Sequence, residues 1–341
     1  MLFQRALEGK PRILAEAVTR AQRAAFARQI NRLIRQTGKL EARKVDAMVG
    51  LLMGAKSQVQ DAIGRLPAGS FSRSMNRIIK SELERALADL SGRASTELGI
   101  SQAEMAKAGL VFTNEIAEMQ GGKPPPYLGL SPEIVENAAT RSADLIRSLS
   151  ERQLGRANEI INTAVITGRS VFDVSQEMAR AFNKSVGQME TIARTEMLGI
   201  HSQVAMAQLS AMEETTPGLH KQWVSVQDER TRLGHRLSFD EGGAHLQSVP
   251  VKEPFRVPLT VVKKGVESLG DIEDMMYPRD PSASPGNSIS CRCQILADYS
   301  QVEEPRGEPL TSEELPPVSV ELTGAGKLVA RELPKAFKNL R

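Results

Sequence analysis

Side chains able to do acid–base chemistry are concentrated in two short stretches of the second half of this 341-residue sequence. Glu196 lies in Ile-Ala-Arg-Thr-Glu-Met, whereas Asp228, Arg230 and His235 follow one another in Asp-Glu-Arg-Thr-Arg-Leu-Gly-His. Gathered in one cleft, they would supply an acid, a base and an anion-binding group, as a nucleotide or nucleic-acid processing enzyme needs. No Gly-rich phosphate loop, nucleophile elbow or complete metal motif accompanies them. We therefore expect structural roles and no catalytic residue, and keep the enzyme centred on Glu196, Asp228 and His235 as the alternative.

Metal binding is a second chemistry that the sequence allows. A tetrahedral zinc site needs about four ligands, and the candidates are His235, Cys291 and Cys293, with His245 as a fourth. Residues two apart on a strand share a face, so both thiols could reach one ion. Two thiols that pack in the core fit this incomplete set better, so we expect no cofactor, with zinc as the alternative. The single residue between the cysteines makes them poor disulfide partners, which favours a reducing compartment.

An ion pair is predicted for Glu196, because it completes the apolar stripe of a helix. The stripe consists of Met189, Ala193, Ile200, Val204, Ala207 and Ala211. A carboxylate on the core-facing side is costly unless a cation or hydrogen-bond donors meet it. Arg194 is too close in sequence to share the stripe. We expect Glu196 to pair with Arg230 or Arg292, and Asp228 to cap the loop that contains it.

Basic side chains concentrate in residues 1–44, which hold eleven Lys or Arg against three acids, whereas the whole chain has a net charge of +3. Apolar residues recur there at steps of three or four and predict a basic amphipathic helix; they are Leu14, Val18, Ala21, Ala25, Phe26, Ile30 and Leu33. Such a helix could lie along a polyanion, or simply present a solvated cationic face. The candidate contact residues are Arg12, Arg20, Arg23, Arg28, Arg32 and Arg35.

Helical periodicity continues to about residue 215. A Ser-rich entry at Ser70, Ser72 and Ser74 precedes apolar residues at Met75, Ile79, Leu83, Leu87 and Leu90. Ser131-Pro132 opens a further helix, residues 154–164 mark another, and Gly168 ends it. Ser170 with Asp173, and Ser185 with Gln188, have the spacing of capping boxes at the next two helices.

Prolines and alternating patterns divide the chain. Consecutive prolines within residues 121–132 cannot continue a helix, and from Lys221 the alternation in Gln-Trp-Val-Ser-Val-Gln indicates a strand. We predict an α+β fold, predominantly α. Its parts are a basic helical arm and bundle (1–120), a Pro/Gly linker (121–132), helices packed on a small irregular β-sheet closed by a Cys-Arg-Cys strand (133–298), and an extended tail (299–341).

Composition fits long helices and excludes some classes of protein. Aromatic residues make up 4% with a single Trp, which favours extended helices packed on Ala, Leu, Ile and Met over a large aromatic core. No stretch approaches the roughly 20 apolar residues of a membrane-spanning helix. The first residues show no apolar signal region, so we expect no secretory export.

Five motifs in a fixed order carry a resemblance. They are Ile192-Ala-Arg-Thr-Glu-Met197, Gln222-Trp-Val224, Asp228-Glu-Arg-Thr-Arg-Leu-Gly-His235, Met276-Tyr-Pro-Arg-Asp-Pro-Ser282 and Ile289-Ser-Cys-Arg-Cys293. Together they resemble the phage Mu protein F family of minor head, or head morphogenesis, proteins over residues 133–298. Many members carry Cys-x-x-Cys where this chain has Arg232 and His235, and Asn where it has Ser290. The full zinc set is therefore missing.

The resemblance implies a structural minor head protein of a tailed phage, made in the host cytoplasm. It would be part of the virion, in the capsid interior or at the portal vertex, and would support head morphogenesis, DNA packaging or early DNA delivery. The implied partners are the portal protein, the major capsid or scaffold protein, and double-stranded DNA, and the basic arm would contact the portal or DNA. A further alternative is an ejection protein that acts at the host membrane.

Overall fold

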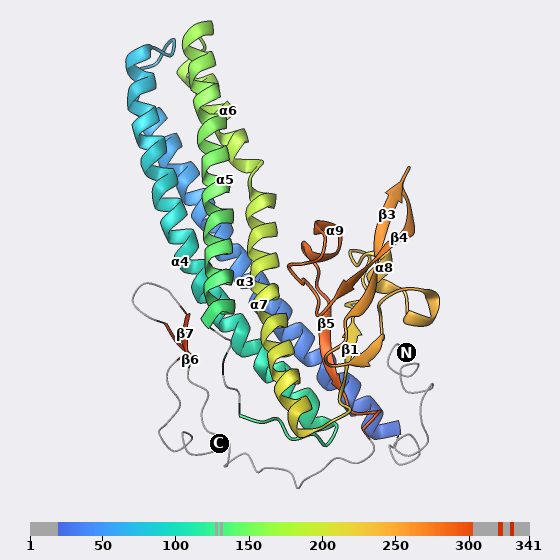
Figure 1. The fold of residues 1–341 in the computed structure, drawn as a ribbon. Coiled ribbons are helices and arrows are strands. Elements are labelled where there is room, and N and C mark those ends of the chain that lie inside the picture. The colour runs from blue at the N-terminus through green and yellow to red at the C-terminus, as the bar shows by residue number, and fades with distance from the viewer. Residues whose placement is uncertain (1–19, 127–128, 130–131, 303–319, 323–327, 331–341) are drawn as a thin grey trace.

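A computed structural model describes residues 20–126, 129, 132–302, 320–322 and 328–330. Five helices form an elongated bundle, and a small β region lies against one side of it (Figure 1). The helices are α3 (Arg20–Gly64), α4 (Arg73–Met119), α5 (Pro132–Thr167), α6 (Val171–Asn183) and α7 (Val186–Thr215). The predicted α+β fold, predominantly α, is confirmed.

Side-chain caps mark the starts of two of the long helices. The Ser72 hydroxyl accepts a hydrogen bond from the Met75 amide at the start of α4, and Ser170 accepts one from the Asp173 amide at the start of α6. Ser185 forms no side-chain cap, because it has αR backbone angles in a short turn between α6 and α7, so the capping box predicted there is wrong. The two helices predicted between residues 132 and 167 are one, α5, since Gly155 is exposed and does not interrupt it.

One hydrophobic core runs along the bundle and takes residues from helices on both sides of the Pro/Gly segment. Its fully buried members include Leu52 of α3, Leu83 of α4, Ile161 of α5 and Val204 of α7. Helices α4 and α7 approach closely where Gly109 faces His201, because a Cβ atom at Gly109 would lie 2.7 Å from the His201 carbonyl oxygen. The division into domains predicted from composition stays a prediction.

The far end of the bundle is tied across its two turns. The Phe71 amide donates to the Arg169 carbonyl at 2.8 Å, and the Val171 amide donates to the Gly69 carbonyl at 2.9 Å. These bonds flank an antiparallel bridge between Ser70 and Ser170. The α3–α4 turn and the α5–α6 turn therefore form a single surface. We call this surface, with the helix turns that border it, the distal end (residues 64–80 and 166–172).

The β region is built around β1 (His220–Val224), which lies between β2 (Ser248–Pro250) and β5 (Gln294–Asp298), antiparallel to both. Strands β3 (Phe255–Lys263) and β4 (Val266–Met275) form a separate hairpin. Lys264 and Gly265, at its tip, both have positive φ, as a two-residue type I′ turn requires. Short helices α8 (Leu233–Arg236), η1 (Phe239–Glu241) and α9 (Pro285–Ser288) lie in the connections. Cys291 and Cys293 precede β5, so the predicted Cys-Arg-Cys strand is wrong by a few residues.

The sheet is docked on the bundle by apolar packing and by one amide side chain. Ile30 and Leu33, from the predicted amphipathic stripe, are buried against α4, β1 and β5. Gln120, directly after α4, donates from Nε2 to the Ala297 carbonyl at 2.6 Å and accepts from the Tyr299 amide at 3.3 Å. The Gln120 side chain thus satisfies the hydrogen-bonding groups of the backbone on the outer edge of β5.

Of the predicted tail, the structure describes Tyr299 to Val302 and two paired strands, β6 (Val320–Leu322) and β7 (Leu328–Ala330). The rest of the tail, and Arg12 of the basic arm, lie outside the described residues. Within the described part, none of the helices has both the length and the apolar character that crossing a bilayer requires.

Candidate functional site

The only group of three or more metal-ligating side chains found among the described residues is His235 with Cys291 and Cys293. His235 Nδ1 lies 3.6 Å from Cys291 Sγ and 3.5 Å from Cys293 Sγ, and all three side chains are buried. Helix α8 supplies the histidine and the segment before β5 supplies both thiols. The Trp223 ring packs edge-on against the imidazole, with centroids 5.4 Å apart.

Two further side chains, Asn287 and Arg279, lie next to this cluster. The Asn287 Oδ1 atom lies 3.0 Å from His235 Nε2. Arg279 is buried beside the cysteines, where Nη1 donates to the Cys291 carbonyl at 2.7 Å and Nη2 donates to the Ser202 hydroxyl. Among the described residues, no carboxylate forms an ion pair with Arg279.

The electrostatics of the two thiols differ. Burial alone raises the pKa of Cys291, but the hydrogen bond with Cys293 and the nearby His235 and Arg279 outweigh it, so the pKa lies well below the usual value. Burial and the adjacent Cys291 raise the pKa of Cys293 well above the usual value.

Asp228 caps its loop, as predicted. Its Oδ1 accepts from the Arg230 amide at 3.1 Å and from the Thr231 hydroxyl at 2.9 Å. The same oxygen accepts from Arg292, and this hydrogen bond is the main cause that lowers the pKa of Asp228 to about 2. The ion pair connects the loop after β1 to the segment between the two cysteines.

Glu196 is buried and ion-paired, but the predicted partners are wrong. Its Oε2 atom accepts from Arg141 at 3.0 Å and from the Ser142 hydroxyl at 3.0 Å, both from α5. Helix α5 lies beside α7 on the side that Glu196 faces. Arg292 instead forms an ion pair with Asp228. The Arg230 side chain is exposed and forms no ion pair with a described residue.

Arg194, two residues before Glu196, faces another helix. Its Nε atom lies 2.5 Å from Glu41 Oε1 of α3. The prediction that it does not share the Glu196 stripe is consistent with this placement. The Arg194–Glu41 pair joins α7 to α3.

The groups of the acid–base hypothesis thus have separate structural partners. Glu196 is hydrogen-bonded inside the bundle, Asp228 is held by Arg292, and His235 faces two sulfurs. His245, the fourth metal candidate, is not part of the three-residue cluster, and its Nδ1 lies 3.2 Å from the Ser225 amide nitrogen. This arrangement fits structural roles for these side chains.

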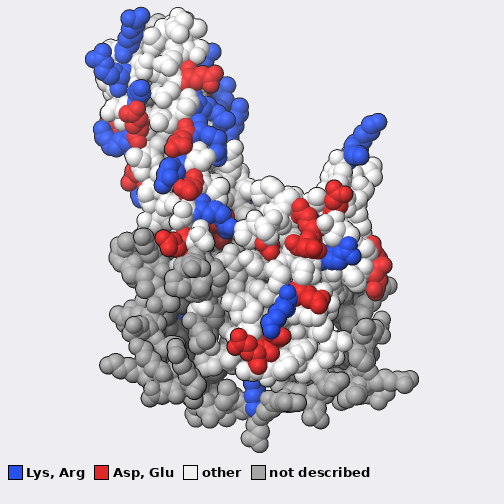
Figure 2. Space-filling model, in the orientation of Figure 1, with Lys and Arg blue, Asp and Glu red and all other residues white. Residues whose placement is uncertain are grey.

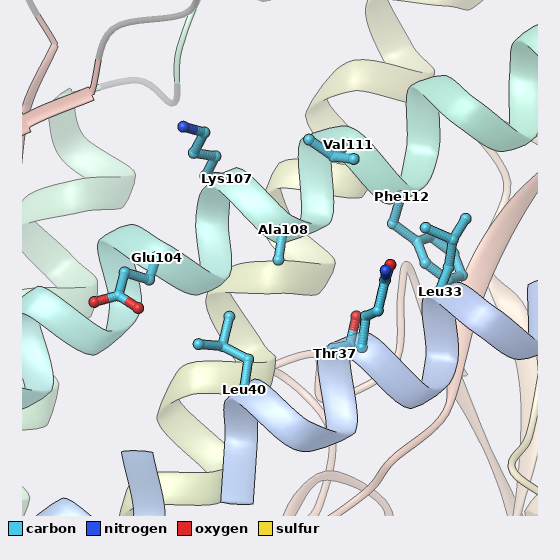
Figure 3. Close-up of a pocket in the computed structure, with 9 residues that line it drawn as sticks. Leu33, Thr37, Leu40, Glu104, Lys107, Ala108, Val111 and Phe112 are labelled. Carbon is cyan, nitrogen blue, oxygen red and sulfur yellow. The ribbon is translucent and has the colours of Figure 1, made fainter. Parts of the chain in front are cut away.

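An open groove between α3 and α4 has a volume of about 330 Å³ (Figure 3). Leu33, Leu40, Val111 and Phe112 line it, with Glu104 at one end. None of the predicted site residues lines this groove.

The predicted contact arginines lie at the start of α3, as far as they are described. Arg28, Arg32 and Arg35 are exposed, and Arg32 pairs with Glu115 of α4 at 3.2 Å. Arg20 and Arg23 lie in the same helix, but their side chains are outside the described residues. Their role in contacting DNA or a portal stays a prediction.

Sequence reasoning missed Arg141, Arg279 and Asn287. Arg279 lies in the Tyr-Pro-Arg-Asp-Pro motif already singled out, and its positive φ of 66° reflects the tight turn there. Arg141 lies in a helix with many exposed charges, so only the arrangement of α5 beside α7 identifies it. Asn287 carries no local signal.

Fold and side chains together define a mainly helical α+β protein in which the buried carboxylates of Glu196 and Glu41 are ion-paired within the bundle. Residues 157–296 match the model of the family described as Phage Mu protein F like protein. The segment, less than half of the chain, runs from within α5 into β5, and the resemblance in its motifs is confirmed. No curated protein and no solved structure matches the chain. The match points to a phage head morphogenesis protein with a structural role in the virion.

Proposed function

We propose that this protein is a structural minor head protein of a tailed phage that assembles near the portal vertex and supports head morphogenesis. The observation that carries the proposal is the Mu F-like segment, residues 157–296, which includes α6, α7 and the sheet. It therefore spans both ends of an elongated molecule (Figure 1). Such a shape suits a protein that bridges two partners in an assembly.

Opposite charges at the two ends support the proposal. Residues 56–80 and 152–184, toward the distal end, hold ten Lys or Arg against four Asp or Glu. Residues 239–280 of the β region hold eight acids against five bases. Figure 2 shows blue side chains interspersed with red ones along the upper arm, and several red side chains with fewer blue ones over the β region. Complementary charge guides association and excludes wrong partners.

Exposed apolar side chains lie at the same two ends. Ile166 is 84% exposed and Phe172 is 69% exposed, on either side of the turn between α5 and α6. On the β3–β4 hairpin, Val262, Val266 and Ile272 are each more than half exposed. Apolar and aromatic side chains near arginine are typical of protein–protein contacts. We assign the distal end to contact with the portal or another head protein.

Mass spectrometry of purified full and emptied particles tests the proposal. The protein should be present in full particles, and its retention after emptying separates a fixed head protein from an ejection protein. Absence from both kinds of particle would exclude a minor head protein.

Variants of the distal end test the assigned contact. The double variant Ile166→Ser/Phe172→Ser should fold, as judged by circular dichroism, but enter particles much less than the wild type. Leu145→Ser removes an exposed apolar side chain from the middle of α5 and should enter normally. Equal incorporation of both variants would contradict contact through the distal end.

A further inference from the structure

We propose that His235, Cys291 and Cys293 bind a thiophilic transition-metal ion of the zinc type. The three ligand atoms lie within 4.8 Å of one another in a buried site that joins α8 to the segment before β5. This inference is independent of any role in a phage head. It rests on the orientation of the imidazole and on the distances to the sulfurs.

Asn287 determines which imidazole nitrogen is free. Its Nδ2 amide donates to the Val257 carbonyl at 3.3 Å and to Glu273 Oε2 at 2.9 Å. Since the amide nitrogen is used for these acceptors, the amide oxygen faces His235 Nε2 and can only accept a hydrogen bond. Nε2 therefore carries the proton, and Nδ1 presents its lone pair to the sulfurs. Metal-binding histidines are commonly oriented in this way by an outer hydrogen bond.

The two sulfurs compete for that single lone pair. A neutral imidazole nitrogen can accept one well-aligned S–H hydrogen bond, yet both thiols lie at nearly the same distance from Nδ1. A metal ion placed among the three atoms satisfies all of them. Zinc bond lengths of about 2.3 Å to sulfur and about 2.0 Å to nitrogen, at tetrahedral angles, place sulfur and nitrogen about 3.5 Å apart. The observed separations of 3.5 and 3.6 Å agree with this value.

A buried cation lies beside the cluster. Arg279, which has no carboxylate partner among the described side chains, donates from Nη1 to the Cys291 carbonyl at 2.7 Å. The described residues supply three ligands, so water or a donor from a partner would complete four-coordination. The ion would link the loop after β1 to the start of β5, beside the Asp228–Arg292 ion pair.

Elemental analysis of the full chain, expressed with added zinc and dialysed, tests the proposal directly. We expect stoichiometric zinc in the wild type and loss of most of it in His235→Ala and in Cys291→Ser/Cys293→Ser. His220→Ala, which removes an imidazole outside the cluster, should keep the metal. Wild-type protein that is folded, holds no zinc and has two reactive thiols would overturn the proposal, as would a Cys291–Cys293 disulfide in protein purified under reducing conditions.

Cobalt substitution keeps the test valid if a variant unfolds. Wild-type protein stripped with a chelator and loaded with Co²⁺ should show sulfur-to-cobalt charge-transfer absorption and the intense visible bands of a tetrahedral site. Asn287→Ala retains all three ligands but frees the imidazole, so it should bind the ion about 10- to 100-fold more weakly. Wild-type spectra without a sulfur-to-cobalt band would rule out the thiolate site.

Discussion

At the scale of single residues, each buried charge described in the bundle is held by a neighbour of opposite charge or by hydrogen bonds. The side chain of Glu196 is 3% exposed, whereas that of its partner Arg141 is 37% exposed. The Glu196 carboxylate therefore depends more on the ion pair than the Arg141 guanidinium does, because the carboxylate is shielded from solvent. Ser142, which donates to Glu196 and accepts from Gln102, adds a second donor.

Replacing Arg141 with alanine leaves the Glu196 carboxylate buried without its cation. We expect a loss of about 2–3 kcal/mol in the free energy of unfolding, somewhat less than for a fully enclosed pair because Arg141 reaches solvent. Urea denaturation measures this loss. The matched control, Arg147→Ala, removes an exposed pair with Asp144 in the same helix and should cost about 0–0.5 kcal/mol. Similar losses of unfolding free energy in the two variants would mean that burial of Glu196 does not increase the cost of removing its partner.

His201 should make stability depend on pH. It is fully buried against Phe112, and burial, with Arg279 nearby, lowers its pKa from 6.5 to about 3. Below about pH 6.5 the unfolded chain binds a proton that the native protein does not, so stability is complete above this pH and falls as the pH drops toward 3. The slope from this residue is at most about 1.4 kcal/mol per pH unit.

Comparison of urea denaturation at pH 7 and pH 5 checks this expectation. The variant His201→Leu should lose less stability between the two pH values than the wild type, because it has no imidazole to protonate on unfolding. His220→Ala, near the surface at the start of β1, should behave as the wild type does. An unchanged pH dependence in His201→Leu would show that this histidine is not the titrating group.

Residue pairings were the least predictable part of the site. The sequence indicated that Glu196 needs a partner, because a carboxylate in an apolar stripe is costly, but the choice of Arg141 depends on how α5 lies beside α7. The chemistry of His235, Cys291 and Cys293 was visible in the residue types. Their convergence required the α8 turn and Asn287, which no periodicity reveals.

At the scale of secondary-structure elements, helices α4 and α7 approach each other closely at Gly109. Gly109 permits it, since a methyl group there would meet the His201 backbone. Backbone cannot move aside as a flexible side chain can. The close approach of α4 and α7 at this point thus depends on a residue without a side chain.

Gly109→Ala should destabilise the protein by about 1–3 kcal/mol, because the added methyl group forces the two helices apart. Gly92→Ala is the matched control, since Gly92 lies in the same helix with nothing within 4 Å of a Cβ atom. It should stabilise by about 0.5–1 kcal/mol through helix propensity alone. Thermal unfolding of both variants measures the difference, and stabilisation by Gly109→Ala would contradict the close contact.

Helices were more predictable than their contacts. The Ser72 and Ser170 caps and the Gly168 stop are local signals, so the ends they mark agree with the sequence. The single helix α5 and the uncapped start of α7 differ from the sequence prediction. Burial in the bundle outweighs the weak local preferences there. The β region was recognised as irregular, but the sheet order depends on contacts distant in sequence.

At the scale of the whole molecule, a basic distal end and an acidic β region make the protein electrically asymmetric (Figure 2). Arg73, Arg77 and Lys80 are exposed on the first turns of α4 and form no ion pair with a described residue. The predicted contact arginines of α3 lie at the opposite end of their helix. Binding of DNA through the distal end and binding through the basic arm can therefore be separated by mutation.

The triple variant Arg73→Glu/Arg77→Glu/Lys80→Glu tests the distal end. If this end contacts DNA, the affinity for double-stranded DNA should fall several-fold, and the dependence on salt concentration should become shallower. Fluorescence anisotropy at several salt concentrations measures both. The control variant Arg28→Glu/Arg35→Glu changes the arm instead. A loss of affinity in the control alone would assign DNA contact to α3.

The Gln120 side chain protects an edge of the sheet when many protein molecules are packed together. A strand at the border of a sheet exposes unused amides and carbonyls, which can recruit a strand from a neighbouring molecule. On β5 the Gln120 side chain already fills such positions at Ala297 and Tyr299. Even where many protein chains are packed at high concentration, this border is shielded against unplanned strand addition.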